Sequence, residues 1–263
     1  MLESMLEIFK SFFVYPGLTW YQALIGIGLA FAFGAAWFAA YRSSILKKPW
    51  AWAILAVSAF LTMAAICFIQ VPLQRWTQDG MVNLWGYTTF VDWLLLTWIP
   101  LVLLTGLIQE GAKLVPVVFY WWRKGKKITP RMGLVLGAVA GLGFGVFEAV
   151  WVHNGVLAAG WDWSLVTSNG VMGLAVFWER LFLVGFHIAA SAIAGYGLAK
   201  GWGWKFYLIA AGLHTLVNYS FALFYTELLG EVGMEIYVVV VSLAVAAIAL
   251  WLRWRRTAEP SPA

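Results

Sequence analysis

Apolar stretches of about 20 residues or more recur seven times along the chain, and they constrain its fold more than any other feature. About 20 helical residues, at 1.5 Å each, cross the hydrocarbon core of a bilayer. The sequence is 63% hydrophobic and 11% charged, whereas typical soluble domains are about 25% charged. We therefore expect an all-α, polytopic membrane helical bundle. The predicted spans are residues 18–40, 50–71, 91–121, 132–153, 171–199, 204–225 and 232–252.

The basic residues are distributed unevenly between the two ends of these spans. Thirteen of the 17 Lys and Arg residues fall in alternate loops and after the last span, whereas the intervening loops hold mainly Asp and Glu. The positive-inside rule then predicts that the N-terminus is outside and the C-terminus is cytoplasmic. This distribution accounts for the net charge of +5, so we expect no nucleic-acid partner.

We expect one integral membrane domain, residues 1–263, that ends in a short cytoplasmic tail at 254–263. Cys67 is the single cysteine, which excludes a disulfide within the chain. No internal repeat is evident, and this weighs against a transporter built from inverted repeats.

Ionisable residues within the predicted spans are few, and each costs on the order of 3 kcal/mol at bilayer depth. Such residues normally face the interior of a bundle or water, and they are functional candidates for that reason. Asp92 and His153 lie near the outer span ends, where we expect them at the interface. The deeper residues are Glu110 and Lys113 on the third span, Glu148 on the fourth, Glu179, Arg180 and His187 on the fifth, and His214 on the sixth.

These polar positions agree in depth and in helical phase. Glu110, His187 and Asn218 each lie 13 residues from a flanking basic residue, Arg123, Lys200 and Lys205 respectively, or about 20 Å along a helix. Pairs at i,i+4 share a helix face: Phe144 with Glu148, His187 with Ser191, and His214 with Asn218. The ridge of Gly133, Gly137, Gly141 and Gly145 predicts close packing of the fourth span. We therefore expect polar groups from four helices to meet at one level.

Several kinds of chemistry could use this set. Glu110 could activate a water molecule as a general base, with a histidine orienting it, while His214 and Asn218 stabilise an oxyanion. Glu110, Glu148, His187 and His214 could instead bind zinc or another divalent metal. Proton-coupled transport and a non-catalytic scaffold with a polar core are two further hypotheses. Glu110 with Lys113, and Glu148 with Arg180, could equally form structural ion pairs.

Four motifs resemble, in order, those of the PrsW-type intramembrane proteases and the broader CAAX-protease/bacteriocin-processing superfamily. "QEGAK", from Gln109 to Lys113, resembles the E-E-x-x-K/R signature. "GLGFGVFEAVW" resembles the glycine-rich F-x-x-x-E motif at Phe144 and Glu148. "RLFLVGFHIAASAIAGYGLAKG" resembles the stretch that places an Arg before a His, here Arg180 and His187, and "HTLVN" resembles the last H-x-x-x-N motif.

This resemblance implies an intramembrane endopeptidase of the glutamic type, with a catalytic core at residues 91–225, in the plasma (inner) membrane of a prokaryote. Its substrate would be a membrane-anchored protein or partner helix, and no cofactor is required unless a divalent metal is bound. On this analogy Glu110 activates water, Glu148 and His187 assist it, and His214 with Asn218 forms the oxyanion site. The supporting residues would be Gln109, Lys113, Phe144, Arg180 and Ser191.

The sequence differs from the signature at one residue, because Gln109 occupies the position of the first of the family's two glutamates. The seven-span layout and the Q-E-x-x-K variant also resemble the seven-helix scaffold subunit of gamma-secretase, which is not catalytic. Glu148 favours the protease interpretation over the scaffold interpretation.

Overall fold

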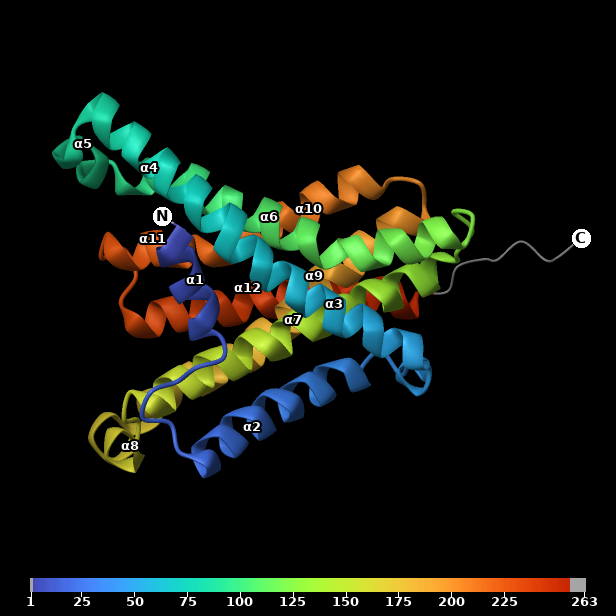
Figure 1. The fold of residues 1–263 in the computed structure, drawn as a ribbon, viewed down its shortest axis with the longest axis horizontal. Coiled ribbons are helices and arrows are strands. Elements are labelled where there is room, and N and C mark those ends of the chain that lie inside the picture. The colour runs from blue at the N-terminus through green and yellow to red at the C-terminus, as the bar shows by residue number, and fades with distance from the viewer. Residues whose placement is uncertain (1, 256–263) are drawn as a thin grey trace, which may run out of the picture.

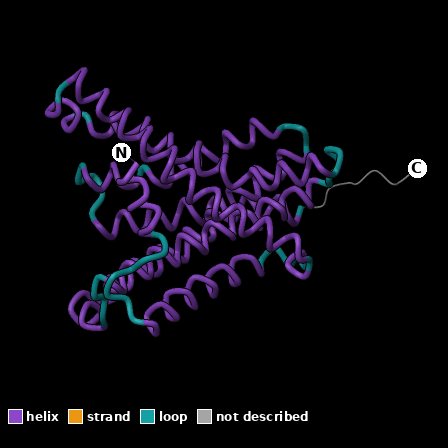
Figure 2. Tube along the Cα trace, viewed as in Figure 1, coloured by secondary structure: helices purple, strands orange, loops and turns teal. Residues whose placement is uncertain are grey.

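The computed structural model describes residues 2–255, so most of the predicted tail at 254–263 lies outside the described residues. Helix accounts for 86% of the structure, and the described part contains no strand (Figure 2). The all-α prediction is therefore confirmed. The elements are α1 (Leu2–Ser11), α2 (Trp20–Ala39), η1 (Ile45–Lys47), α3 (Pro49–Ala65), η2 (Ile66–Gln70), α4 (Val71–Trp85), α5 (Tyr87–Asp92), α6 (Leu94–Arg123), α7 (Pro130–Ala158), α8 (Trp163–Asn169), η3 (Gly170–Leu174), α9 (Ala175–Ala199), α10 (Gly203–Asn218), α11 (Ser220–Tyr225) and α12 (Glu231–Trp254).

Seven of the helical segments in residues 2–255 are long and apolar enough to cross a membrane, as the sequence predicts. The chain is thus an integral membrane protein. The loops that carry the basic residues gather with the C-terminal end of α12 at one end of the bundle, on the right in Figure 1. Helices α4, α5, α8 and α11 lie at the other end.

The second span differs from its predicted length. We predicted that it ends at residue 71, but helix continues without a break through η2 and α4 to Trp85. Pro72 does not stop it, because proline is tolerated in the first turn of a helix and η2, a π-helix, precedes α4 at that point. The added turns are much more polar than the span before them, and they carry Gln74 and Gln78.

Helices α7 and α9 form the centre of the bundle, and the glycine ridge brings them together. In the most apolar 18-residue stretch, 78% of the residues are buried in α7 and 83% in the span that contains α9, compared with 50% or less in the other spans. A Cβ added at Gly133, Gly137 or Gly141 would overlap the main-chain oxygen of Gly195, Ser191 or His187 respectively. The predicted close approach is confirmed, and it sets the position of His187 relative to α7.

Gly141→Ala is expected to lower the free energy of unfolding by about 1–3 kcal/mol, because the new methyl group meets main-chain atoms of α9 that cannot move aside. Gly212→Ala on α10 is the control, since a Cβ there meets nothing within 4 Å and alanine favours helix over glycine. Thermal unfolding in detergent, followed by tryptophan fluorescence, measures both. An equal effect in the two variants would contradict this packing argument.

Candidate functional site

Glu110 lies at the centre of a polar cluster formed by α6, α9 and α10. Its side chain is fully buried. Oε1 accepts a hydrogen bond from Lys113 Nζ at 2.5 Å, one turn along α6, and is 2.7 Å from His214 Nδ1. Oε2 accepts a hydrogen bond from Ser191 Oγ at 3.2 Å. The predicted Glu110–Lys113 pair is thus present, and it is tied to two further helices.

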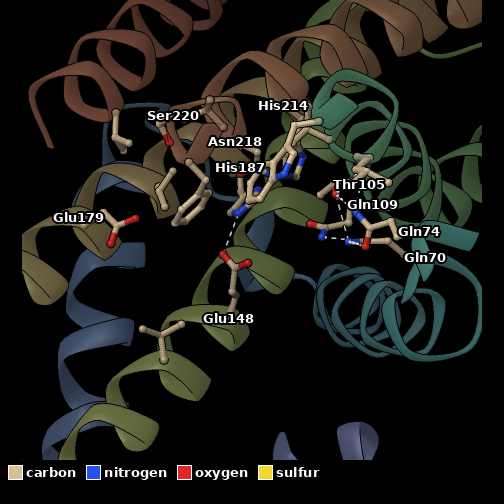
Figure 3. Close-up of a pocket in the computed structure, with 18 of the residues that line it drawn as sticks. Gln70, Gln74, Thr105, Gln109, Glu148, Glu179, His187, His214, Asn218 and Ser220 are labelled. Atoms are coloured by element: carbon tan, nitrogen blue, oxygen red, sulfur yellow. Dashed lines mark hydrogen bonds and ion pairs between the residues drawn. The ribbon is translucent and has the colours of Figure 1, made fainter. Parts of the chain in front are cut away.

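His187 links this cluster to Glu148 on α7. Lys113 Nζ lies 3.1 Å from His187 Nδ1, and Glu148 Oε2 lies 3.0 Å from His187 Nε2 (Figure 3). A lysine ammonium can only donate, so Nδ1 accepts and Nε2 carries the proton that it donates to Glu148. Phe144 packs edge-on against the His187 ring, with centroids 5.1 Å apart. This packing fixes the plane of the imidazole.

Arg180 extends the chain of contacts beyond Glu148. Its Nη1 donates to Glu148 Oε2 at 3.3 Å, and its Nη2 donates to Glu179 Oε1 at 2.7 Å. The predicted Glu148–Arg180 pair is therefore present. A continuous path of hydrogen bonds and ion pairs leads from His214 through Glu110, Lys113, His187 and Glu148 to Arg180.

A cavity of about 520 Å³ lies against one side of this path. Residues of α4, α9 and α11 border it. Helices α4 and α11 lie at the end of the bundle that is opposite the basic loops (Figure 1). The Glu148 side chain borders the cavity and is 19% exposed, whereas the Glu110 side chain is 0% exposed and lies behind the histidines. Of the predicted site residues, those that line the cavity are Gln109, Glu148, Arg180, His187, His214 and Asn218.

Gln109 and Asn218 differ from the other predicted residues in their contacts. Gln109 points away from the Glu110 cluster and donates a hydrogen bond to Gln70 Oε1 at 3.0 Å. Asn218 lines the cavity one turn after His214, and within residues 2–255 its side-chain amide makes no hydrogen bond. That amide is available to a bound molecule.

His153 lies inside the bundle. Its side chain is fully buried and its Nδ1 lies 3.2 Å from the main-chain oxygen of Gly26, whereas its depth near the membrane interface stays a prediction. The side chain is buried because α2 packs across this part of α7, so that His153 serves a helix–helix contact. Asp92, by contrast, is exposed.

Sequence reasoning missed a group of uncharged polar residues on the cavity wall. Gln70 and Gln74 lie one turn apart and contact Thr105 on α6 (Figure 3). The i,i+4 spacing of Gln70, Gln74 and Gln78 was a usable signal. We did not use this spacing because we predicted that the second span ends at residue 71, before Gln74 and Gln78.

The donor set of the cluster fits a divalent metal ion. Glu110, His187 and His214 each offer one ligand atom, and these atoms lie within 4.8 Å of one another. One carboxylate and two imidazoles form a usual ligand set for catalytic zinc. The Lys113 ammonium lies among the same atoms, so it is the group that would have to yield to a metal.

Comparison with known proteins gives one family. A family model described as "PrsW family intramembrane metalloprotease" matches residues 46–248, which is more than half of the chain and includes every predicted site residue. No curated protein and no solved structure matches the chain.

Proposed function

We propose, since this chain belongs to the PrsW family of intramembrane metalloproteases, that it is an endopeptidase that hydrolyses peptide bonds of membrane-anchored proteins within the bilayer. The observation that carries the proposal is the Glu148–His187 pair, which borders a polar-lined cavity between the helices. Water has to reach a peptide bond that is buried in the bilayer. This cavity gives water a place beside a carboxylate, two imidazoles and an amide.

Glu148 is the residue to which we assign water activation. The family resemblance places this role on Glu110, but the Glu110 carboxylate is fully buried and bonded on both oxygens. A general base must lie within hydrogen-bond reach of the water it deprotonates, and Glu148 borders the cavity. His187 donates to Glu148 and orients it. Arg180 stabilises the ionised carboxylate.

His214 and Asn218 face the cavity from α10 and are suited to stabilise the oxyanion. As an imidazolium, His214 would donate Nδ1–H to the Glu110 carboxylate and Nε2–H to the oxyanion. The Asn218 amide donates from the next turn. Each such donor is worth about 3 kcal/mol in a water-poor site. After the peptide bond breaks, Glu148 returns its proton to the leaving amine.

Glu110, His187 and His214 would hold the metal ion that the family description implies. The chemistry that such an ion would supply is Lewis-acid polarisation of the scissile carbonyl group. With the ion bound, Glu110 would be one of its ligands, and Glu148 would remain at the cavity as the general base.

We place the protein in the plasma membrane of a prokaryote, with the basic loops in the cytoplasm, in accordance with the positive-inside rule. The cavity would then face the outer half of the bilayer, and cleavage would occur there. The substrate is a membrane-anchored protein or helix.

A reconstituted assay tests both the activity and the metal. Full-length protein in liposomes is mixed with a single-span reporter whose leucine-rich helix contains a central glycine triplet, and the fragments are identified by mass spectrometry. We expect cleavage within the span, loss of cleavage after chelation and recovery with Zn²⁺. Glu110→Gln, which removes a ligand, should lower bound metal the most, and Glu148→Gln, which alters the carboxylate that orients His187, should lower it by about tenfold. Glu179→Gln, which contacts none of the three ligands, should retain the metal.

Cleavage that persists in metal-free protein would show that the mechanism needs no metal ion and relies on the Glu148–His187 pair. A protein that never cleaves the reporter but co-purifies with partner helices would instead be the non-catalytic scaffold.

A further inference from the structure

The wall of the cavity nearest α4 and α6 is built from uncharged polar side chains. Gln70 Nε2 donates to Gln74 Oε1 at 3.3 Å and to Thr105 Oγ1 at 3.2 Å. Gln74 Nε2 donates to Thr105 Oγ1 at 2.9 Å and to the main-chain oxygen of Leu101 at 2.8 Å. Gln109 Nε2 donates to Gln70 Oε1 at 3.0 Å. We call Gln70, Gln74, Thr105 and Gln109 the amide wall (Figure 3).

The amide wall has unused capacity to accept hydrogen bonds. Both amide protons of Gln70 are donated within the wall, and those of Gln74 are donated to Thr105 and to the main-chain oxygen of Leu101. The oxygens are less occupied, because a carbonyl oxygen can accept two hydrogen bonds, and Gln70 Oε1 and Gln74 Oε1 each accept one here. Gln109 is 6% exposed, and its Oε1 is buried without any partner in the described chain. The wall therefore offers acceptors to a molecule in the cavity.

An unwound peptide segment in a membrane has the complementary need. Each main-chain N–H group that leaves a helix must find a new acceptor, at a cost of several kcal/mol if it does not. A protease must open the helix of a membrane substrate before water can reach its peptide bond. The amide wall lines the same cavity as Glu148 and His187, so it lies beside the place where that opening is needed.

We propose that the amide wall is a subsite that binds the main-chain N–H groups of an unwound substrate segment, without regard to side-chain sequence. This inference rests on the proposed protease function. It assigns Gln109 a positioning role that does not require the second carboxylate of the family signature. The wall would favour spans with a flexible, helix-breaking segment over continuous helices.

Binding of three synthetic probes to the full-length chain tests this subsite separately from hydrolysis. Each is a labelled single-span peptide of leucine and alanine: one has a central Gly-Gly-Gly, one has three sarcosines there, and one is a continuous helix. Sarcosine is N-methylglycine, so it keeps the break but removes the N–H groups. Affinity is measured by energy transfer in phosphatidylcholine nanodiscs, using the Glu148→Gln protein to prevent turnover.

We expect the glycine probe to bind about tenfold more tightly than the sarcosine probe or the continuous helix, which is the effect of losing one or two hydrogen bonds. Gln109→Leu should abolish the difference between the glycine and sarcosine probes. Gln74→Leu, at a half-buried position, should reduce it and serves as the second variant. Asn83→Leu, which replaces an exposed amide on the same helix, should leave it unchanged.

Equal binding of the glycine and sarcosine probes, or a difference that survives in both Gln109→Leu and Gln74→Leu, would overturn the subsite. The outcome is independent of catalysis. If the Glu148→Gln protein shows this binding pattern while the wild type cleaves nothing, the amide wall is retained and the protease function is lost. If the wild type cleaves the reporter but the probes bind equally well with and without their N–H groups, the protease function stands and the subsite does not.

Discussion

Glu148→Gln is expected to lower the rate of peptide cleavage by about a thousandfold without unfolding the protein. General-base catalysis contributes about 10²- to 10⁴-fold, and an amide cannot take a proton from water. Glutamine matches glutamate in size and can still accept from His187 and Arg180, which hold Glu148 at 3.0 Å and 3.3 Å. The liposome assay with the glycine-triplet reporter gives the rate, and thermal unfolding confirms the fold.

Glu179→Gln is the matched control for this prediction. Glu179 lines the same cavity and is bonded to the same arginine, but its hydrogen bond is with Arg180 and not with His187. We expect a change of less than about tenfold, the effect of weakening one ion pair that is partly exposed to water. If Glu148→Gln kept its activity, Glu148 would not be the general base. Water activation would then belong to Glu110 if Glu110→Gln lost cleavage while it still bound the metal.

The common level at which the site residues meet could be predicted because helix geometry is regular. The 13-residue offsets of Glu110, His187 and Asn218 and their shared helix faces follow from the rise and period of an α-helix. Glu110 and His187 meet as expected through Lys113. Gly141 predicted the contact that places His187, because small residues permit close approach of helices.

Exposure to the cavity could not be predicted in this way. Sequence spacing gives depth and face, but Glu110 and Glu148 differ in which neighbours cover them, and this depends on how α9 and α10 pack. The amide wall was missed for a related reason. A hydropathy window ends a span where polar residues begin, whereas the helix continues through η2 into α4 and carries Gln74 to the cavity.

Lys113→Met is expected to destabilise the metal-free protein by about 3–5 kcal/mol, the usual cost of removing one partner from a buried ion pair. Both side chains of the Lys113–Glu110 pair are 0% exposed, so the carboxylate loses its cation where no water can replace it. Lys10→Met is the control, because Lys10 and Glu7 have the same i,i+3 spacing but are 63% and 67% exposed. We expect less than about 1 kcal/mol there. Chemical unfolding in detergent measures both.

The double variant Glu110→Gln/Lys113→Met decides whether the lost stability comes from charge or from packing. If the cost lies in an unpaired buried carboxylate, neutralising Glu110 should restore most of it, because a neutral pair can replace a buried ion pair at little net cost. Zn²⁺ gives a second answer. A metal held by Glu110, His187 and His214 would supply the missing positive charge, so it should stabilise Lys113→Met more than the wild type. Equal stabilisation by Zn²⁺ in the two proteins would mean that Lys113 and the metal do not compete for the same carboxylate.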